Sequence, residues 1–411
     1  MIQDKIELTK DVYLVGKIDD RNVPFHRLNL AKGTTYNSYY IDTESPTIID
    51  TVDISFGKEY VDGLKKHLDL SVIKYIVINH VEPDHSGGLP ALASQAKNAI
   101  IVCTELAAEE LKKLYGLYNR EFRIVTDGDV LDLGGKTLKF FETPYLHTEE
   151  TMSTYLVEDK ILFSCDIFST HLANFEYFND AAGIDIDEDF ALYYRLIMHP
   201  HRRHVAEMLQ KIETLPIGMI APSHGYIIRE NADKYIAIYE EMSRPTEVSK
   251  KAVVLYSSMT GTTKKMSILF QQNFEENGIP AEVIDMNKAE EKSVLKSVEE
   301  ADLVLIGTST KYADMTGNTE GLVQQIVEMN LEGKIGGAFG SFGWSGEGTE
   351  VLQDYLLKSN MDVLTTTNII KTTGVDNVHF PLRMRSLPED ERRRIVGRAA
   401  NFVSGILLNA N

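Results

Sequence analysis

The residues from His80 to His85 constrain this chain more than any other stretch, because four of these six side chains are potential metal ligands. The sequence HVEPDH follows YIVIN, an apolar β-branched run typical of a buried strand, and precedes two glycines that permit unusual backbone angles. The motif therefore predicts a strand that ends in a tight turn and presents His80, Glu82, Asp84 and His85 together.

Three more candidate ligands end later strand-like runs. His147 follows TLKFFETPYL, Asp166 follows KILFSC, and His224 follows GMIAPS. Because the strand ends of an open α/β layer converge on one edge, we expect these side chains to meet the first four. Three carboxylates and four imidazoles are enough to hold two metal ions, with one carboxylate bridging them and an open coordination position on each.

A structural alternative is that His80 and Asp84 only cap a helix, and that the other candidates are satisfied polar groups at loop starts. Seven such residues at strand ends favour the metal site over this alternative. Carboxylate-rich sites that also contain imidazole favour iron or manganese, although zinc accepts the same ligands. The ligand types alone therefore leave the identity of the metal open.

Composition excludes several classes of partner. The formal net charge of −19 opposes binding to nucleic acid or to an anionic membrane surface, because each contact would add like-charge repulsion. The first residues, MIQDKIELTK, contain no apolar signal segment, and no apolar run is long enough to span a bilayer, so we expect a cytoplasmic protein. The only cysteines, Cys103 and Cys165, lie in apolar strand-like runs and are expected to be buried small hydrophobic residues.

The length and patterning predict two domains. At 411 residues the chain exceeds the roughly 250 to 300 residues beyond which a single core usually splits. Strand-like runs and helix-like stretches form a mixed α/β pattern up to about residue 240, and the aperiodic stretch Met242–Lys250 marks the expected boundary. From Lys251 strands and helices alternate regularly, which predicts a doubly wound parallel sheet, with a short last strand near Asn368 and a terminal helix.

Three polar loops follow consecutive strands of this second region. SSMTGTT leads into a helix whose positive end and free amides suit a phosphate, while GTSTKYADMTGN and GSFGWSGE reach the same edge of the sheet. The only tryptophan, Trp344, is placed to stack on a flat ring, with Tyr312 as the matching residue of the second loop. Together the loops predict an FMN site. Its candidate residues are Ser257, Ser258, Met259, Thr260, Gly261, Thr262, Thr263, Ser309, Thr310, Lys311, Tyr312, Ser341, Phe342, Gly343, Trp344, Ser345 and Gly346.

With both motif sets in this order, the chain resembles the flavodiiron proteins over essentially its whole length. HVEPDH matches the HxExDH motif that stands in this family where related hydrolases carry HxHxDH. The resemblance implies an N-terminal metallo-β-lactamase-like αββα sandwich over residues 1–248 and a C-terminal flavodoxin-like domain over residues 251–411. Lys311 and Tyr312 depart from the shorter, more apolar segment of many members, which bears on the loop contacts and not on FMN itself.

The resemblance also implies roles for individual residues. It assigns His80, Glu82 and His147 to one iron, Asp84, His85 and His224 to the other, and Asp166 to the bridge between them. It further places His171, in FSTHLANF, and Tyr193 or Tyr194, in ALYYRLIM, in the substrate pocket as hydrogen-bond or proton donors. For each of these three, ordinary packing of an aromatic helix face is the alternative.

The expected function follows from the same resemblance. It is an oxidoreductase that passes electrons from FMN to a diiron centre, which reduces dioxygen to water, nitric oxide to nitrous oxide, or both, and so protects against oxygen or nitrosative stress. The sequence contains no CxxC pair and no GxGxxG motif, so we expect a separate donor, by resemblance rubredoxin or alternatively reduced deazaflavin. A head-to-tail homodimer, or a dimer of dimers, is implied as well.

Two rival functions remain in view. A zinc hydrolase would use a metal-bound hydroxide, but Glu82 and the fused flavin region argue against it. A plain electron carrier would leave seven convergent ligands unexplained. The stretch MHPHRRH offers three further histidines beside two arginines and no carboxylate or cysteine, and we interpret it as a solvated helix start.

Overall fold

We describe a computed structural model of the chain, covering residues 5–21, 24–25, 28–29, 32–181, 183–244, 250–317, 319–373, 375, 377–385 and 387–409. The chain divides into two compact units, Met1–Arg244 and Pro245–Asn411. The centre of the predicted boundary stretch, residues 245–249, lies outside the described residues. Each unit is described by itself.

The first unit contains two main sheets. The seven-stranded sheet has the order β1 (Ile6–Thr9), β2 (Val12–Leu14), β7 (Tyr39–Ile41), β8 (Thr47–Ile49), β9 (Tyr75–Val77), β10 (Ile100–Cys103) and β11 (Phe122–Ile124). The five-stranded sheet has the order β12 (Val130–Asp132), β13 (Thr137–Glu142), β14 (Met152–Leu156), β15 (Ile161–Cys165) and β16 (Met219–Pro222). Two short pairs, β3 (Lys17–Asp19) with β6 (Thr34–Tyr36) and β4 (Pro24–Phe25) with β5 (Leu28–Asn29), are the other strands among the described residues of this unit.

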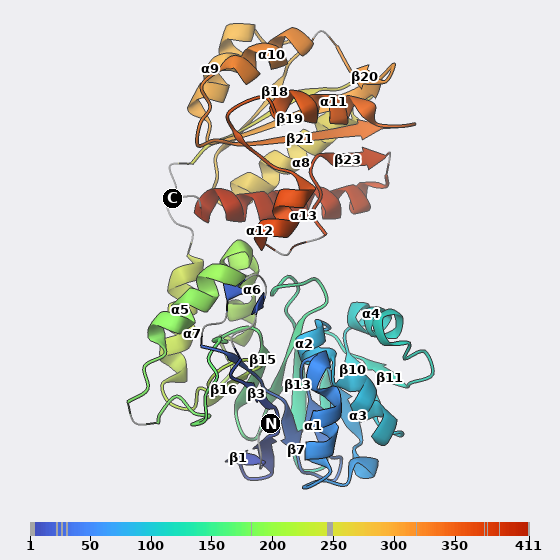
Figure 1. Cartoon of the computed structure of the whole chain (residues 1–411), viewed down its shortest axis with the longest axis vertical. Coiled ribbons are helices and arrows are strands. Elements are labelled where there is room, and N and C mark those ends of the chain that lie inside the picture. The colour runs from blue at the N-terminus through green and yellow to red at the C-terminus, as the bar shows by residue number, and fades with distance from the viewer. Residues whose placement is uncertain are drawn as a thin grey trace. The chain divides into compact units, whose positions relative to one another are not determined.

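Helices cover the outer faces of these sheets (Figure 1). One group comprises α1 (Gly57–Leu64), α2 (Pro83–Ser86), α3 (Leu89–Gln95) and α4 (Glu105–Tyr115), and the other comprises α5 (Asp187–Tyr193), α6 (Arg202–Ile212) and α7 (Ala232–Ser243). Strand β13 shows why the layers form: Phe140 packs in the apolar cluster that both sheets share, whereas Phe141 packs against α5 to α7. Successive strand residues face opposite sides, so both faces of this sheet are buried and the layer order is αββα.

The second unit is a doubly wound sheet, with strands β18 (Ala281–Asp285), β17 (Ala252–Ser257), β19 (Leu303–Lys311), β21 (Ile335–Phe342) and β22 (Asp362–Val363) in that order. All neighbours along this order are parallel, β23 (Leu382–Arg385) pairs with β21, and β20 (Asp314–Met315) pairs back onto β19. Val254 packs towards α8 (Thr262–Glu276) and α13 (Glu389–Asn409), while Val253 packs towards α9 (Glu291–Glu300), α10 (Glu320–Glu328) and α11 (Glu347–Leu356). Helices therefore cover both faces, as the alternating pattern predicted.

The predicted strand near Asn368 is wrong. Residues Thr366–Thr373 form the helix α12, and the last strand is β23. The β-branched run TTTNII suggests a strand, but tertiary packing decides otherwise, because the helix places Ile369 in the apolar cluster beneath α8 and α13.

Candidate metal centre and flavin site

The HVEPDH turn is held by its own backbone. After β9, the chain turns into the short helix α2, which starts with Pro83 at its first position and carries Asp84 and His85 in its single turn. Gly87 ends this turn against the backbone of the 3-10 helix Ile54–Phe56, where a Cβ atom would lie 2.3 Å from Ile54 N. Only glycine fits this close approach, so Gly87, two residues after the motif, allows the turn to pack here.

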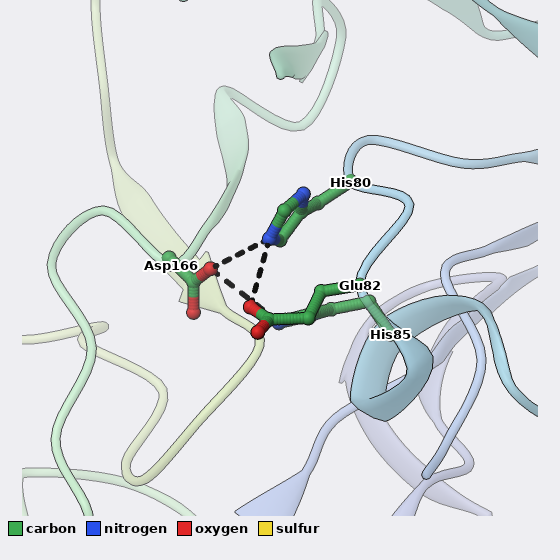
Figure 2. A group of neighbouring side chains, drawn as sticks. All are labelled: His80, Glu82, His85 and Asp166. Atoms are coloured by element: carbon green, nitrogen blue, oxygen red, sulfur yellow. Dashed lines mark hydrogen bonds and ion pairs between the residues drawn. The ribbon is translucent and has the colours of Figure 1, made fainter. Parts of the chain in front are cut away.

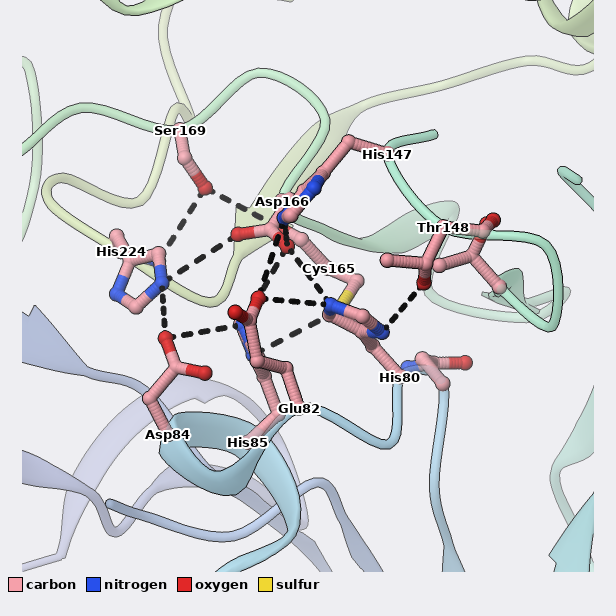
Figure 3. Close-up of polar contacts among 12 residues, drawn as sticks. His80, Glu82, Asp84, His85, His147, Thr148, Cys165, Asp166, Ser169 and His224 are labelled. Atoms are coloured by element: carbon pink, nitrogen blue, oxygen red, sulfur yellow. Dashed lines mark hydrogen bonds and ion pairs between the residues drawn. The ribbon is translucent and has the colours of Figure 1, made fainter. Parts of the chain in front are cut away.

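His80, Glu82 and His147 form one half of the cluster (Figure 3), and Figure 2 shows two of them, His80 and Glu82, beside His85 and Asp166. Glu82 Oε2 lies 3.2 Å from both His80 Nε2 and His147 Nε2. Asp166 Oδ2 lies 3.6 Å from His80 Nε2 and 3.5 Å from His147 Nε2. Four polar atoms from three separate chain segments therefore face one point.

Asp84, His85 and His224 form the other half (Figure 3). Asp84 Oδ2 lies 3.3 Å from His85 Nε2 and from His224 Nε2. Asp166 reaches this half too, because its Oδ2 lies 3.4 Å from His85 Nε2 and its Oδ1 lies 3.4 Å from His224 Nε2. Asp166 is thus the carboxylate that lies close to the histidines of both halves, and His85 also lies within 4.8 Å of ligand atoms in each half.

The rings of two histidines are oriented by bonds on their outer nitrogens. His80 Nδ1 donates to Glu150 Oε1 at 2.7 Å, and His224 Nδ1 donates to the carbonyl oxygen of Thr35 at 2.6 Å. A ring whose Nδ1 carries the donated proton directs the lone pair of Nε2 into the cluster, which is the arrangement found in metal-bound histidines.

The three polar loops of the second unit meet through one hydroxyl. Thr263, fully buried in the first turn of α8, lies with its Oγ1 3.0 Å from Ser309 Oγ and 2.8 Å from Ser341 Oγ. Met259 N donates to the same Ser309 Oγ at 3.3 Å. The carboxyl ends of β17, β19 and β21 are therefore tied together at one edge of the sheet.

Two large aromatic side chains stand out from this edge. Tyr312 and Trp344 are 91% and 90% exposed. The second polar loop differs from its predicted form: β19 continues to Lys311 and turns back into β20 through Tyr312 and Ala313, whose φ values are 53° and 61°. Such a hairpin holds Tyr312 at its tip, away from the protein core.

Comparison with known proteins decides the family. A family model described as ODP family beta lactamase matches residues 35–225, and one described as Flavodoxin matches residues 254–368. An anaerobic nitric oxide reductase flavorubredoxin from Vibrio vulnificus is 34% identical over 349 residues, which are 83% of this chain and 70% of that protein. The chain belongs to the flavodiiron protein family.

Solved structures agree with this assignment. The flavodiiron protein of Giardia intestinalis is 28% identical, with a TM-score of 0.57 over 99% of both chains. The rubredoxin:oxygen oxidoreductase of Desulfovibrio gigas is 27% identical, with a TM-score of 0.56 over 98% of this chain and 99% of that one. The predicted fold class, a metallo-β-lactamase-like sandwich followed by a flavodoxin-like sheet, is confirmed.

The seven side chains fit the diiron centre of a flavodiiron protein. Asp84 Oδ1 and Oδ2, His85 Nε2 and Asp166 Oδ2 are buried and have no hydrogen-bond partner among the described residues. Buried polar atoms without partners are costly, and a cation removes that cost. Ligand atoms on one metal ion lie roughly 3.0 to 3.4 Å apart, because metal–nitrogen and metal–oxygen bonds measure roughly 2.1 Å, and the spacings in both halves are close to this range.

The same groups perturb each other's proton affinity in the metal-free flavodiiron chain. Burial disfavours the charged ring of His224, yet the carboxylates of Asp166 and Asp84 beside its Nε2 outweigh burial and raise its pKa to about 9. Burial likewise disfavours the Glu150 carboxylate, but the charge and hydrogen bond of His80 lower its pKa to about 2. Protons on the imidazoles balance the carboxylates here, so a metal ion must displace protons when it binds.

The residues predicted to line the substrate pocket of a flavodiiron protein separate into two groups. The hydroxyl of Tyr193 donates to Asp166 Oδ1 at 2.9 Å, and the His171 ring lies 5.0 Å from the Tyr193 and His224 rings. Tyr194 does not join them: its hydroxyl lies 2.8 Å from Ser243 Oγ in the core beside α7. Consecutive helical residues point about 100° apart, so only one of the two tyrosines can face the cluster.

The FMN candidates of this flavodiiron chain also divide. Helix α8 has Gly261 as its N-cap residue, has no side-chain cap and carries no acidic residue in its first turn, which fits a phosphate. The fully buried hydroxyl of Ser257 instead donates to Thr316 O and accepts from Asn287 Nδ2 at 3.0 Å. The hydroxyls of Ser257 and Thr263 therefore organise the loops, which leaves cofactor contacts to the exposed parts of the predicted set.

The sequence did not predict two side chains that contact the outer nitrogens of the cluster histidines. Glu150 is 4% exposed, and its acidic neighbour Glu149 makes the pair look like an ordinary surface loop; the only signal was its position three residues after His147. Cys165 and Cys103 are buried free thiols, as expected, but Cys165 Sγ also lies 3.7 Å from His85 Nδ1. Neither the contact of Glu150 with His80 nor the contact of Cys165 with His85 follows from residue spacing alone.

The stretch MHPHRRH starts helix α6, as predicted, after a short 3-10 turn at His199–His201. It is less solvated than expected, because Arg202 is 6% exposed and the His204 ring lies 4.7 Å from the Tyr145 ring. None of the helices in the described part of the chain combines the length and the apolarity that crossing a bilayer requires.

Proposed function

We propose that this flavodiiron protein reduces dioxygen, nitric oxide, or both at a non-haem diiron centre, using electrons that it receives through bound FMN. The observation that carries the proposal is the pair of three-residue halves that share Asp166. When bound, FMN supplies one- and two-electron transfer and the two irons supply the open coordination positions at which a small gas is reduced.

We assign the ligands as the cluster arranges them. His80, Glu82 and His147 would hold one iron, Asp84, His85 and His224 would hold the other, and Asp166 would serve both. A ligand set of carboxylates and imidazoles favours iron, whereas thiolate-rich sites are typical of structural zinc. The glutamate in the second position of the motif also separates this ligand set from the histidine-rich set of the related hydrolases, so we do not favour hydrolysis.

Tyr193 and His171 are the side chains that we propose for the substrate side. Tyr193 bonds to the shared carboxylate, and the His171 ring lies edge-on to Tyr193 and tilted against His224. Reducing dioxygen to two waters consumes four electrons and four protons, and coupling two nitric oxides consumes two of each. A hydroxyl and an imidazole beside the ligands are suited to orient the gas and to pass protons to it.

Electron delivery and assembly complete the proposal. The named relatives include a flavorubredoxin and a rubredoxin:oxygen oxidoreductase, so we propose rubredoxin as the external donor, with reduced deazaflavin as the alternative. We further propose functional domains over residues 1–248 and 251–411, a cytoplasmic location, and a head-to-tail homodimer that brings the flavin of one subunit to the diiron centre of the other, alone or as a dimer of dimers.

Anaerobic gas-consumption assays test this function. Purified holoprotein with chemically reduced rubredoxin should consume nitric oxide, dioxygen or both, and the Asp166→Ala variant should lose at least 100-fold of that rate because both irons lose their shared ligand. Consumption of neither gas by protein that holds iron and FMN would overturn the proposal. Equal rates of gas consumption in Asp166→Ala and in the unaltered protein would show that the cluster does not take part in the reaction.

A further inference from the structure

The carboxylate of Glu150 lies directly behind one histidine of the cluster. Its Oε1 accepts from His80 Nδ1 at 2.7 Å and from Val81 N at 3.2 Å. The main chain of Glu150 is held in turn, because Thr104 Oγ1 donates to its carbonyl oxygen at 2.9 Å. Glu150 is therefore a fixed acceptor and not a mobile surface side chain.

The histidines of the other half have neutral partners in the corresponding position. His224 Nδ1 donates to the Thr35 carbonyl oxygen at 2.6 Å, and His85 Nδ1 lies 3.7 Å from the thiol of Cys165. The two halves have the same ligand types, two imidazoles, one carboxylate and the shared Asp166. Glu150 hydrogen-bonds directly to a histidine of one half, whereas the buried carboxylate of Asp50, whose charge also acts on His85, bonds to Asn79.

We propose that Glu150 is a positioning residue that makes the His80–Glu82–His147 half the tighter of the two metal sites, filled first and emptied last. A carboxylate that accepts the outer N–H of an imidazole increases the basicity of the ring as a ligand, whereas a carbonyl or thiol does so less. Removing such a partner typically weakens metal binding 10- to 100-fold. This inference rests on the proposed diiron function.

Solvent exposure affects the rate of metal release in the direction opposite to the proposed order of affinity. The Glu82 and His147 side chains are 28% and 19% exposed, whereas Asp84 and His224 are 6% and 1% exposed. The more exposed half exchanges metal with solvent more quickly, so release rates would mix access with affinity. The order of the two sites must therefore be measured at equilibrium.

The first experiment locates a limiting amount of iron. Metal-free full-length protein is equilibrated anaerobically with one ferrous ion per chain and crystallised, and anomalous scattering measures the occupancy of each position. We expect at least a 10-fold preference for the half with His80, and a nearly even distribution in the Glu150→Gln variant. Equal occupancy in the unaltered protein, or a preference for the half with His224, overturns the proposal.

Stepwise ferrous dissociation constants in solution, measured by chelator competition, provide the second test. Glu150→Gln should weaken the tighter step 10- to 100-fold and change the weaker step less than 3-fold, while Glu150→Asp, which keeps the charge, should lose less. Thr148→Val is the control that keeps the Glu150 charge and removes a hydroxyl that lies 3.2 Å from the same His80 Nδ1 and also hydrogen-bonds to Glu150; it should weaken the tighter step less than Glu150→Gln does.

The outcomes separate this inference from the function on which it rests. If neither position holds iron at two equivalents, the diiron function itself fails. If both fill but Glu150→Gln weakens them equally, or weakens neither, the function stands and the role of Glu150 fails. Should Glu150→Gln not fold, the occupancies in the unaltered protein and the constants of Glu150→Asp still decide.

Discussion

Tyr193 donates a hydrogen bond of 2.9 Å to Asp166, the carboxylate that joins the two halves of the metal cluster. The tyrosine is 4% exposed, and its pKa lies well above the ordinary value because burial and the neighbouring Asp166 charge both disfavour the phenolate. The hydroxyl therefore remains a donor to Asp166 throughout the physiological pH range.

Replacing Tyr193 with phenylalanine removes this hydroxyl and keeps the ring. We expect turnover of the reducible gas to fall about 10-fold or more, since a hydrogen bond to a charged group is worth roughly 1.5 to 3 kcal/mol, with both irons retained. Tyr194→Phe is the control: it loses only the contact with Ser243 in the core and should keep full turnover. Equal losses in both variants would contradict the assignment of Tyr193.

Thr263 should control FMN affinity through the two serines that it joins. Thr263→Val leaves the Ser309 and Ser341 hydroxyls without their shared partner, and we expect FMN to dissociate about 10-fold more readily, measured by the recovery of flavin fluorescence. Ser267→Ala is matched, because Ser267 is equally buried on α8 but bonds only to the Thr263 carbonyl oxygen. Unchanged FMN binding in Thr263→Val would show that the loops keep their shape without the hydrogen bonds of Thr263 to Ser309 and Ser341.

Trp344 offers a direct optical probe of the flavin site, because it is the only tryptophan in the chain. An indole that stacks on the flavin ring should lose at least half of its fluorescence when FMN is added to flavin-free protein. Tyr312→Ala should leave most of this quenching in place while weakening FMN binding. Full tryptophan emission with FMN bound would place the indole away from the ring.

Cys103 makes alkaline stability depend on pH. Burial raises the pKa of its thiol from 9.0 to about 12, so between these values the unfolded chain releases a proton that the folded chain retains. The stabilising contribution is therefore complete below pH 9 and is lost as the pH rises, by up to about 1.4 kcal/mol per unit. Denaturant titrations at pH 8 to 11 should show a steeper loss in the parent than in Cys103→Ala; identical slopes would contradict the burial of a protonated thiol.

The fold and the ligand cluster could be predicted from the sequence because their signals are local. Each predicted ligand follows an apolar run. The expectation that these runs end at the edge of one layer is wrong, because His80 to His85 follow β9 of the seven-stranded sheet, whereas His147, Asp166 and His224 follow β13, β15 and β16 of the five-stranded sheet. Residues that do not end such a run carry no local signal. Glu150 meets His80 from a loop that is distant in sequence, and its position could be seen only after the sheets were assembled.

The rotation of helix α5 about its axis, which decides whether Tyr193 or Tyr194 faces the cluster, could not be predicted from the sequence either. Tyr193 and Tyr194 are adjacent, and the wider turn at Tyr194–Met198 shifts the rotation of the residues that follow α5. The sequence could therefore name the pair but not choose its member. The strand predicted near Asn368 was wrong for a related reason. The β-branched residues of Thr366–Thr373 suggest a strand, and only the packing of Ile369 favours the helix.

The most direct test of the central claim is the metal and flavin content of protein purified from iron-supplemented cells, by elemental analysis and chromatography of extracted flavin. We predict close to two irons and one FMN per chain, with both irons lost from Asp166→Ala and the FMN retained. Zinc in place of iron, with no flavin, would contradict the diiron account and restore the hydrolase alternative.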